Sequence, residues 1–527
     1  MFSPLLSFPI VLGLAAAGGL PALPLPGLRA PVQGGLIADI EDWTEGFGRR
    51  KRGVGEQAFE QIRTLLIDLR GFGRTSSGHR LQAARALLDL HGAGLTAARA
   101  RDAEREAEGW ALQDLSAREF AALLDQDVAR WTAREVLVVE SGNTPARRAA
   151  AARMLRGLHT REVRLALTIC IRGSVPLLAE TAARALVGWK DEAVHQLFSG
   201  LLARTGPPAP PMLLGAAVDH FRRVRLTPGN RAVADLEAYV RAHVGAEPWR
   251  SASRAASVSH ALPDRQAVPV LIDALEAWGV RVRSGGRVTR LQYDISRELA
   301  ARSGLELGLR ADRWRTWWGA VESGQIDAGP RDPAEGFTRA AFFGLRPETG
   351  RVVFVLDNSG SMGQVFRREG LGTFDAWTRY RESIEQMVKF LESLGPGARF
   401  GVVLFNDGTQ RWRSGLHPAT PGHLKAARAW CLRRKPQGGT QLRHGVQQAM
   451  EVGPGGRVDL DALEADTLIV LCDGQTSDGS RWVLPLLRRE NPLAQVVIHC
   501  VQIGAGGDGT LELLAESTGG DFVRVEN

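Results

Sequence analysis

Several common catalytic signatures are missing from this 527-residue sequence. It has no HExxH zinc motif, no GxSxG nucleophile elbow, no glycine-rich dinucleotide fingerprint and no GxxxxGK[ST] phosphate loop. Its eleven histidines are scattered along the chain. These absences argue against an enzyme of the corresponding classes. They also imply that any ATPase working with this chain is a separate protein.

Cysteine is scarce: the four residues are Cys170, Cys431, Cys472 and Cys500. None belongs to a CxxC pair and none has histidines at metal-binding spacing, so a zinc site is not expected. The apolar runs around most of them predict buried thiols. Cys472 and Cys500 fall on strands that are candidates for neighbours, which leaves a disulfide between them open.

Long apolar runs are absent beyond the first 34 residues, so no later segment is expected to span a membrane. Leu5–Ala17 is apolar and ends in three alanines that resemble a cleavage site. We interpret residues 1–34 as a signal peptide followed by a Pro/Gly-rich segment, which predicts export to the periplasm or cell envelope. No Lys or Arg precedes the stretch, and Pro4 and Pro9 interrupt it. The alternative is a Pro/Gly-rich N-terminus of a cytoplasmic protein.

The formal net charge of +8 is spread along the chain. The dense basic run at residues 49–52 is interpreted as a solvated loop, so no nucleic-acid partner is expected. A chain of this length is expected to form about two to four domains.

Residues 35–320 are predicted to be all-α. Amphipathic helices of similar length follow one another in pairs, joined by loops with Gly, Pro or Asn, which is typical of an α-solenoid. Residues 267–275 resemble a helix of a HEAT-type repeat; the alternative is a generic all-α domain. Trp314, Trp317 and Trp318 are expected to share one face and to close the end of the solenoid. The predicted helices are 58–69, 81–90, 110–124, 146–158, 162–171, 175–189, 192–202, 231–244, 265–278 and 305–318.

Residues 321–337 are predicted to be a linker, and residues 338–527 an α/β domain. Apolar strands alternate there with helical segments, which predicts a doubly wound, mostly parallel, Rossmann-like sheet. The predicted strands are 352–356, 400–405, 410–413, 467–472, 495–503 and 522–525. The predicted helices are 374–394, 423–433, 442–452, 482–489 and 510–517.

Oxygen-bearing side chains follow the ends of these elements. Asp357, Ser359 and Ser361 come directly after the first strand, Thr440 follows a Gly-Gly turn, and Asp473 follows the fourth strand. Ligand sites in parallel sheets lie beyond the carboxyl ends of the strands. Carboxylates and hydroxyls are hard ligands, suited to Mg²⁺, Mn²⁺ or Ca²⁺.

The three motifs Asp-Asn-Ser-Gly-Ser (357–361), Gly-Gly-Thr (438–440) and Cys-Asp-Gly-Gln (472–475), in this order, resemble a von Willebrand factor A (integrin I-type) domain. The resemblance covers residues 338–527 and is of the bacterial type that carries HEAT-like repeats. It implies a metal-ion-dependent adhesion site that holds a divalent cation, with Mg²⁺ expected first. It also implies a protein partner whose Asp or Glu completes the metal shell.

The resemblance also assigns roles. The hydroxyls of Ser359 and Ser361 would bind the cation directly, Thr440 directly or through water, and Asp357 and Asp473 mostly through water. The helix that usually closes this fold has no counterpart after Val525, which puts a metal-linked conformational switch in doubt.

Three functions follow as hypotheses. The first is a non-enzymatic binding protein that captures a partner through the metal, with the helical repeats as scaffold or second interaction surface. The second is a regulatory or adaptor subunit of a separate, chelatase-like AAA+ ATPase complex. The third, a metal-dependent hydrolase, lacks an evident general base, so we do not expect an enzyme.

Overall fold

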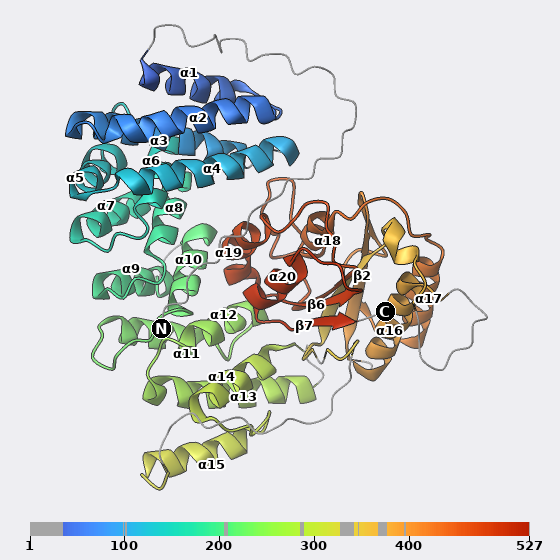
Figure 1. The fold of residues 1–527 in the computed structure, drawn as a ribbon. Helices are drawn as coiled ribbons and strands as arrows, with labels where there is room; N and C mark the ends of the chain where they lie inside the picture. The colour runs from blue at the N-terminus through green and yellow to red at the C-terminus, as the bar shows by residue number, and fades with distance from the viewer. Residues whose placement is uncertain are drawn as a thin grey trace. The chain divides into compact units, whose positions relative to one another are not determined.

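The computed structural model describes residues 35–98, 100, 103–204, 209–284, 289–326, 342–345, 347–366, 377–394 and 397–525. The predicted signal peptide and most of the predicted linker lie outside these residues. The chain divides into two compact units, Met1–Ala185 and Leu186–Asn527 (Figure 1). Among the described helices, none combines the length and apolar character that a bilayer crossing requires.

The described part of the first unit is helical. Several of its helices begin at side chains that accept a hydrogen bond from the first turn: Ser76, Asp125, Thr144 and Thr160. The elements are α1 (Leu36–Arg49), α2 (Glu56–Gly73), α3 (Ser77–Ala97), α4 (Ala103–Leu123), α5 (Gln126–Trp131), the π-helix η1 (Thr132–Val138), α6 (Pro145–Met154) and α7 (Arg161–Arg172). Helix α8 (Pro176–Leu186) ends at the boundary of the unit.

Seven helices open the described part of the second unit. They are α9 (Glu192–Leu202), α10 (Pro211–Phe221), α11 (Ala232–His243), α12 (Trp249–Ser259), α13 (Asp264–Arg283), α14 (Leu291–Ser303) and α15 (Ala311–Glu322). Contacts run from α9 to α11, α13 and α15 in turn, and from α10 to α12 and α14. We call these the outer layer and the inner layer. The layered stack confirms the predicted all-α region, whereas its HEAT-like character stays a prediction.

The three clustered tryptophans lie on α15, and all are buried. Trp314 and Trp317 meet edge to face, and the Trp314 indole donates to the Gly308 carbonyl at 2.8 Å. Since α15 contacts α13, the buried rings lie on the last outer-layer helix, and their role in closing the end of a solenoid stays a prediction.

A mostly parallel sheet follows, and its described strands run in the order β3-β2-β1-β5-β6-β7. Strands β3 and β4 both pair with β2 in antiparallel fashion, and the remaining neighbours are parallel. The predicted α/β class is confirmed. The strands are β1 (Arg351–Asp357), β2 (Arg399–Phe405), β3 (Thr409–Arg411), β4 (His417–Pro418), β5 (Thr467–Cys472), β6 (Val497–Ile503) and β7 (Phe522–Val525).

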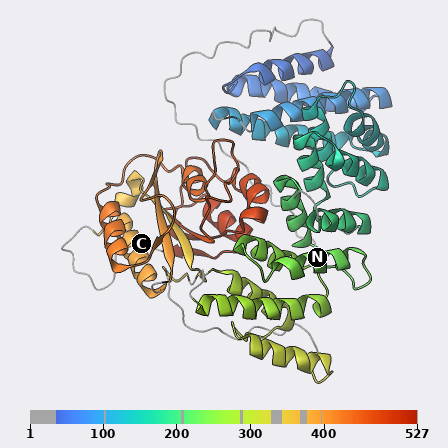
Figure 2. The same ribbon diagram turned by 180° about the vertical axis from the view of Figure 1, so that it is seen from behind.

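Helices cover both faces of this sheet, as Figures 1 and 2 show. Helices α16 (Arg379–Leu394) and α17 (Pro421–Leu432) lie on one face. Helices α18 (Leu442–Ala449), α19 (Val483–Ala494) and α20 (Thr510–Thr518) lie on the other. Alternate residues of β1 enter the two cores, Phe354 on the α16 face and Val355 on the α18 face. Burial on both faces explains the uninterrupted apolar run of this strand.

The inner layer lies against the sheet domain within the second unit. Helices α10 and α12 contact α19. Arg250 of α12 is buried, stacks on Trp249, and donates to the carbonyls of Leu463, Ala465 and Ala494. Arg290, just before α14, donates to the carbonyls of Asp466 and Gln495. We call Arg250 and Arg290 the arginine clamp.

The clamp closes on the residues that precede β5 and β6. Asp466 is fully buried there, and its carboxylate accepts from the Arg290 backbone N–H (3.0 Å), the Thr349 hydroxyl (2.7 Å) and the Thr467 hydroxyl (2.9 Å). Burial raises the pKa of Asp466, and the Arg290 charge is the largest influence opposing that rise. The clamp therefore lies at the amino-terminal edge of the sheet.

Candidate metal centre

The carboxylate of Asp357 is fixed at the carboxyl end of β1. Its Oδ1 accepts the backbone N–H of Ser359 at 2.7 Å, and its Oδ2 accepts the thiol of Cys472 at 3.0 Å. The 3₁₀-helix η2 (Gly360–Gly363) then turns the chain. This turn places the hydroxyl oxygens of Ser359 and Ser361 3.0 Å apart.

The Gly-Gly-Thr loop is tied to this first motif through its backbone. The N–H of Gly360 donates to the Gly438 carbonyl at 3.1 Å, and the N–H of Gly439 donates to Asp407 Oδ1 at 2.8 Å. Gly438 has φ +78°, and a Cβ there would lie 2.3 Å from the Asp407 carboxylate, so both the backbone conformation and the space favour glycine. Thr440 is nearly buried, and its hydroxyl makes no hydrogen bond within the described residues.

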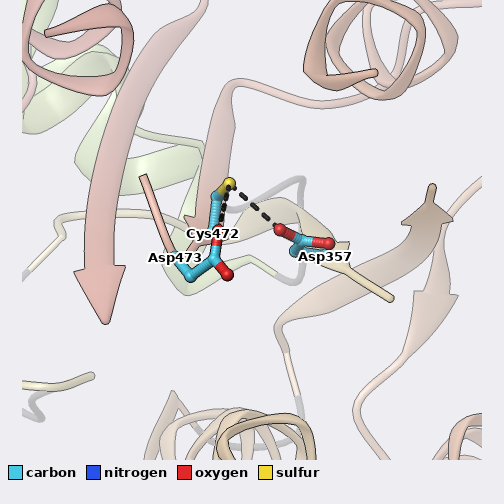
Figure 3. Close-up of side chains that lie close together, drawn as sticks. All are labelled: Asp357, Cys472 and Asp473. Carbon is cyan, nitrogen blue, oxygen red and sulfur yellow. Dashed lines mark hydrogen bonds between the residues drawn. The ribbon is translucent and has the colours of Figure 1, made fainter. Parts of the chain in front are cut away.

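Asp473 brings the second carboxylate from the end of β5. Ligand atoms of Asp357, Cys472 and Asp473 all lie within 4.8 Å of one another. Figure 3 shows the Cys472 sulfur above the two carboxylates, 3.0 Å from Asp357 Oδ2 and 4.0 Å from Asp473 Oδ1. The third loop joins the second, because the Ser477 N–H donates to the Thr440 carbonyl at 2.9 Å.

The strand order explains why these loops meet. From β1 the sheet continues to β2 on one side and to β5 on the other, so β1 and β5 flank the point at which the connections diverge. Loops at the carboxyl ends of such strands separate and leave a crevice. Asp357 and Asp473 follow these two strands, which places both carboxylates at the expected edge.

Burial dominates the electrostatics of Asp357. It raises the pKa of this carboxyl group to about 6, while hydrogen bonds from Cys472 and Ser359 act in the opposite direction. Burial, with the neighbouring Asp357 charge, also raises the pKa of the Cys472 thiol well above its usual value. The thiol therefore stays protonated in this structure and acts as a hydrogen-bond donor to Asp357.

The arrangement fits a divalent cation of the hard class. Two carboxylates and three hydroxyls come from three loops that are hydrogen-bonded to one another, and oxygen donors of this kind suit Mg²⁺ or Mn²⁺. The structure brings Asp357 and Asp473 together, and likewise Ser359 and Ser361. It places Thr440 beside them through its loop backbone.

Sequence reasoning missed three residues near the site. Cys472 was predicted to be buried, but its bond to Asp357 was not foreseen. Asp407 follows β2 at the same edge of the sheet, so the end-of-strand rule could have identified it. Arg379, whose Nη1 lies 4.0 Å from Asp473 Oδ2, begins α16 and carries no local signal of its position.

All four cysteines are free and buried, and Cys472 and Cys500 are not cross-strand partners: Cys472 pairs with Gln502, and Cys500 with Val470. We therefore expect a thiol reagent such as DTNB to find no reactive thiol in the native protein and four after denaturation. Two thiols after denaturation would instead indicate the disulfide that the sequence left open.

Comparison with known proteins identifies a domain family and several relatives for part of this chain. Residues 376–523 match the profile of the von Willebrand factor type A domain. Inter-alpha-trypsin inhibitor heavy chain H1 of Mesocricetus auratus is 33% identical over 131 residues, which are 24% of this chain and 13% of that protein. Heavy chain H4 of Homo sapiens is 25% identical over 138 residues, 26% of this chain and 13% of that protein.

The chain thus spans a small part of the length of these relatives. Among solved structures, the conserved hypothetical protein BatB from Bacteroides thetaiotaomicron aligns with 34% of this chain and 90% of its own at 14% identity. The TM-score of this alignment is 0.25. A von Willebrand factor type A domain, hereafter the A domain, is present in the chain. The matched residues begin after Ser361, so the first motif is placed by the structure.

Proposed function

We propose that this protein is a non-enzymatic binding protein that captures a protein partner through a divalent cation. Asp357, Ser359, Ser361, Thr440 and Asp473 would hold the cation, with Mg²⁺ the expected ion. A cation there supplies an electrophilic centre for an Asp or Glu carboxylate of the partner. The observation that carries the proposal is the meeting of three hydrogen-bonded loops, with their carboxylates and hydroxyls, beside β1 and β5.

The protein's own residues prepare the site in distinct ways. Cys472 and the Ser359 N–H orient the Asp357 carboxylate. Asp407 and the φ of Gly438 shape the loop that presents Thr440. Such supporting bonds stabilise the donor geometry before a cation arrives.

The position of the inner layer favours a partner that comes from outside the second unit. The clamp engages residues 463–466 and 494–495, at the opposite edge of the sheet from Asp357 and Asp473. The seven residues of β6 separate these edges, a length of about 20 Å. Helices α12 and α14 would therefore act as a scaffold, leaving the metal edge to another acidic group.

Two parts of the proposal rest on the sequence alone. Export to the periplasm or cell envelope rests on the apolar stretch at residues 5–17. The absence of enzymatic activity rests on the absence of catalytic motifs. A regulatory role beside a separate AAA+ ATPase remains the alternative, and the identity of the captured partner separates the two.

We expect Asp357→Ala and Asp473→Ala to weaken Mg²⁺ and Mn²⁺ binding by about 10- to 100-fold or more, because each removes a carboxylate that anchors the ion. Calorimetric titration would measure this, with the exposed Asp461→Ala as a charge-matched control. Far-UV circular dichroism should show the helices intact. Wild-type cation affinity in either site variant would show that the site is wrongly assigned.

Partner capture tests the second half of the proposal. A pull-down with wild type and Asp357→Ala, each in Mg²⁺ and in EDTA, should retain the partner only with wild type and metal. An ATPase among the retained proteins would favour the adaptor role, and an envelope protein would favour adhesion. Equal capture in all four conditions would indicate that the partner binds to the helices and not to the metal site.

A further inference from the structure

Arg379 brings a positive charge to the proposed metal centre. Its Nη1 lies 4.0 Å from Asp473 Oδ2, and the two side chains are only 14% and 9% exposed. This separation exceeds hydrogen-bonding distance, so the contact is one of charge rather than a directed bond. The described residues thus place two carboxylates and one guanidinium at the same edge of the sheet.

The local fold holds Arg379 in this place. Its backbone N–H donates to the Gln364 carbonyl at 3.0 Å, which joins the start of α16 to the end of the Asp357 motif. Its guanidinium lies over Gly504, where a Cβ would come within 3.1 Å of Nη2. Gly504 has φ +100°, so both the backbone conformation and the space favour glycine.

The guanidinium makes no side-chain hydrogen bond within the described part of the chain, and its buried Nε has no partner there. Arg290, in contrast, has its guanidinium bonded to two carbonyls and to the Asp294 carboxylate. A largely buried arginine side chain without such bonds is unusual and calls for an explanation. Arg379 thus lacks the hydrogen bonds that hold Arg290 in place, and its charge lies beside Asp473.

We propose that Arg379 is a resident positive charge that weakens cation binding and makes it depend on the partner's carboxylate. The inference rests on the proposed function and adds a regulatory feature to the same site. Two carboxylates alone would neutralise a divalent cation. With Arg379 beside them, the loaded site keeps one positive charge. An incoming carboxylate neutralises that charge, so cation and acidic partner bind more tightly together than separately.

Mn²⁺ titration of the full chain, followed by calorimetry, tests this without a partner. We expect Arg379→Gln to bind Mn²⁺ about tenfold more tightly or better, because it removes a unit charge lying a few ångström from a divalent ion. Arg379→Lys keeps the charge and should stay within about threefold of wild type. Arg381→Gln on the same helix, whose guanidinium stacks on Trp377, is the matched control and should bind as wild type does.

The outcomes separate this inference from the proposed function. Mn²⁺ binding that is equal or weaker in Arg379→Gln than in wild type would overturn the role of Arg379 while leaving the metal site standing. A tenfold gain in Arg381→Gln as well would also overturn it, by showing a general charge effect. If neither wild type nor any variant binds Mn²⁺, both the proposed function and this inference fail.

Discussion

Replacing Arg290 with alanine is expected to lower the free energy of unfolding of the second unit by about 3–5 kcal/mol, the usual cost of breaking a buried charged network. The substitution removes the donors to the carbonyls of Asp466 and Gln495 and the buried partner of Asp294. It also removes the positive charge that most strongly opposes the rise in the pKa of the fully buried Asp466. Arg250→Ala should act in the same direction, because three carbonyls lose their donor.

Urea unfolding of the full chain, followed by tryptophan fluorescence, measures this effect. Arg241→Ala is the control: Arg241 pairs with Glu237 at 2.9 Å but is 61% exposed, so its loss should cost no more than about 0.5 kcal/mol. Equal stability of the Arg290 and Arg241 variants would mean that the clamp does not hold the inner layer on the A domain.

The contacts of the arginine clamp also predict which fragments of the chain are stable. A fragment that begins at residue 338 follows the predicted domain boundary but uncovers Asp466, Gln495 and the α19 surface that α10 and α12 cover. We expect this fragment to be less stable than one spanning residues 186–527, which keeps the clamp. Similar melting temperatures for the two fragments would contradict this expectation.

Lowering the pH is the second change with a large expected effect, acting through one buried histidine in each unit. Burial lowers the pKa of His91 and of His220 to about 3, and the charges of Arg153 and His195 act in the same direction. In the unfolded chain these histidines take up a proton near pH 6.5. In the folded chain they do so only near pH 3. Stability is therefore full above about pH 6.5 and is lost as the pH falls, by about 2 kcal/mol per histidine at pH 5.

The histidine effect is tested by variants that do not titrate; His220→Asn also alters the contact of His220 Nε2 with His195 Nδ1 at 2.9 Å, so it reports on this pair. In His91→Asn and His220→Asn, the amide can replace Nδ1, which meets the Ser116 hydroxyl at 3.0 Å and accepts the Gly188 N–H at 3.1 Å. Urea unfolding at pH 7 and pH 5 should show a smaller loss in each variant than in wild type. Asp357, with its raised pKa, titrates in the opposite sense, so the difference between variant and wild type is the quantity to compare. If each variant lost as much stability between pH 7 and pH 5 as wild type does, the histidines would not be the cause.

The sheet and the site motifs were accessible from sequence because their signals are local. A strand buried on both faces appears as a continuous apolar run, which is how 352–356 and 467–472 were identified. Polar residues directly after such runs lie at one edge of a parallel sheet. Asp357 and Asp473 could therefore be assigned to one site before any coordinates.

The predicted helices do not include α10, α12 and α14, which form the inner layer, and α12 shows the physical reason. Helix α12 is rich in alanine and serine, and most of its side chains are buried between neighbours. Apart from Trp249 and Val258, its buried positions are filled by small or polar side chains, so the segment lacks the large apolar residues that mark the neighbouring helices. Arg250 and Arg290 donate to backbone carbonyls, which every residue has. The side chains of residues 463–466 therefore give no sequence signal for this contact. The position of Arg379 likewise depends on tertiary packing around Gly504.

The clamp also has a consequence for the order of events during synthesis. Arg250 and Arg290 leave the ribosome before their carbonyl partners, and about 190 residues separate the end of α14 from Gln495. At ordinary elongation rates this interval lasts roughly 10–40 s. During that time the inner layer is exposed with two uncapped guanidinium groups and no sheet to cover them. The inner layer can therefore complete its contacts only after β5 and β6 have emerged.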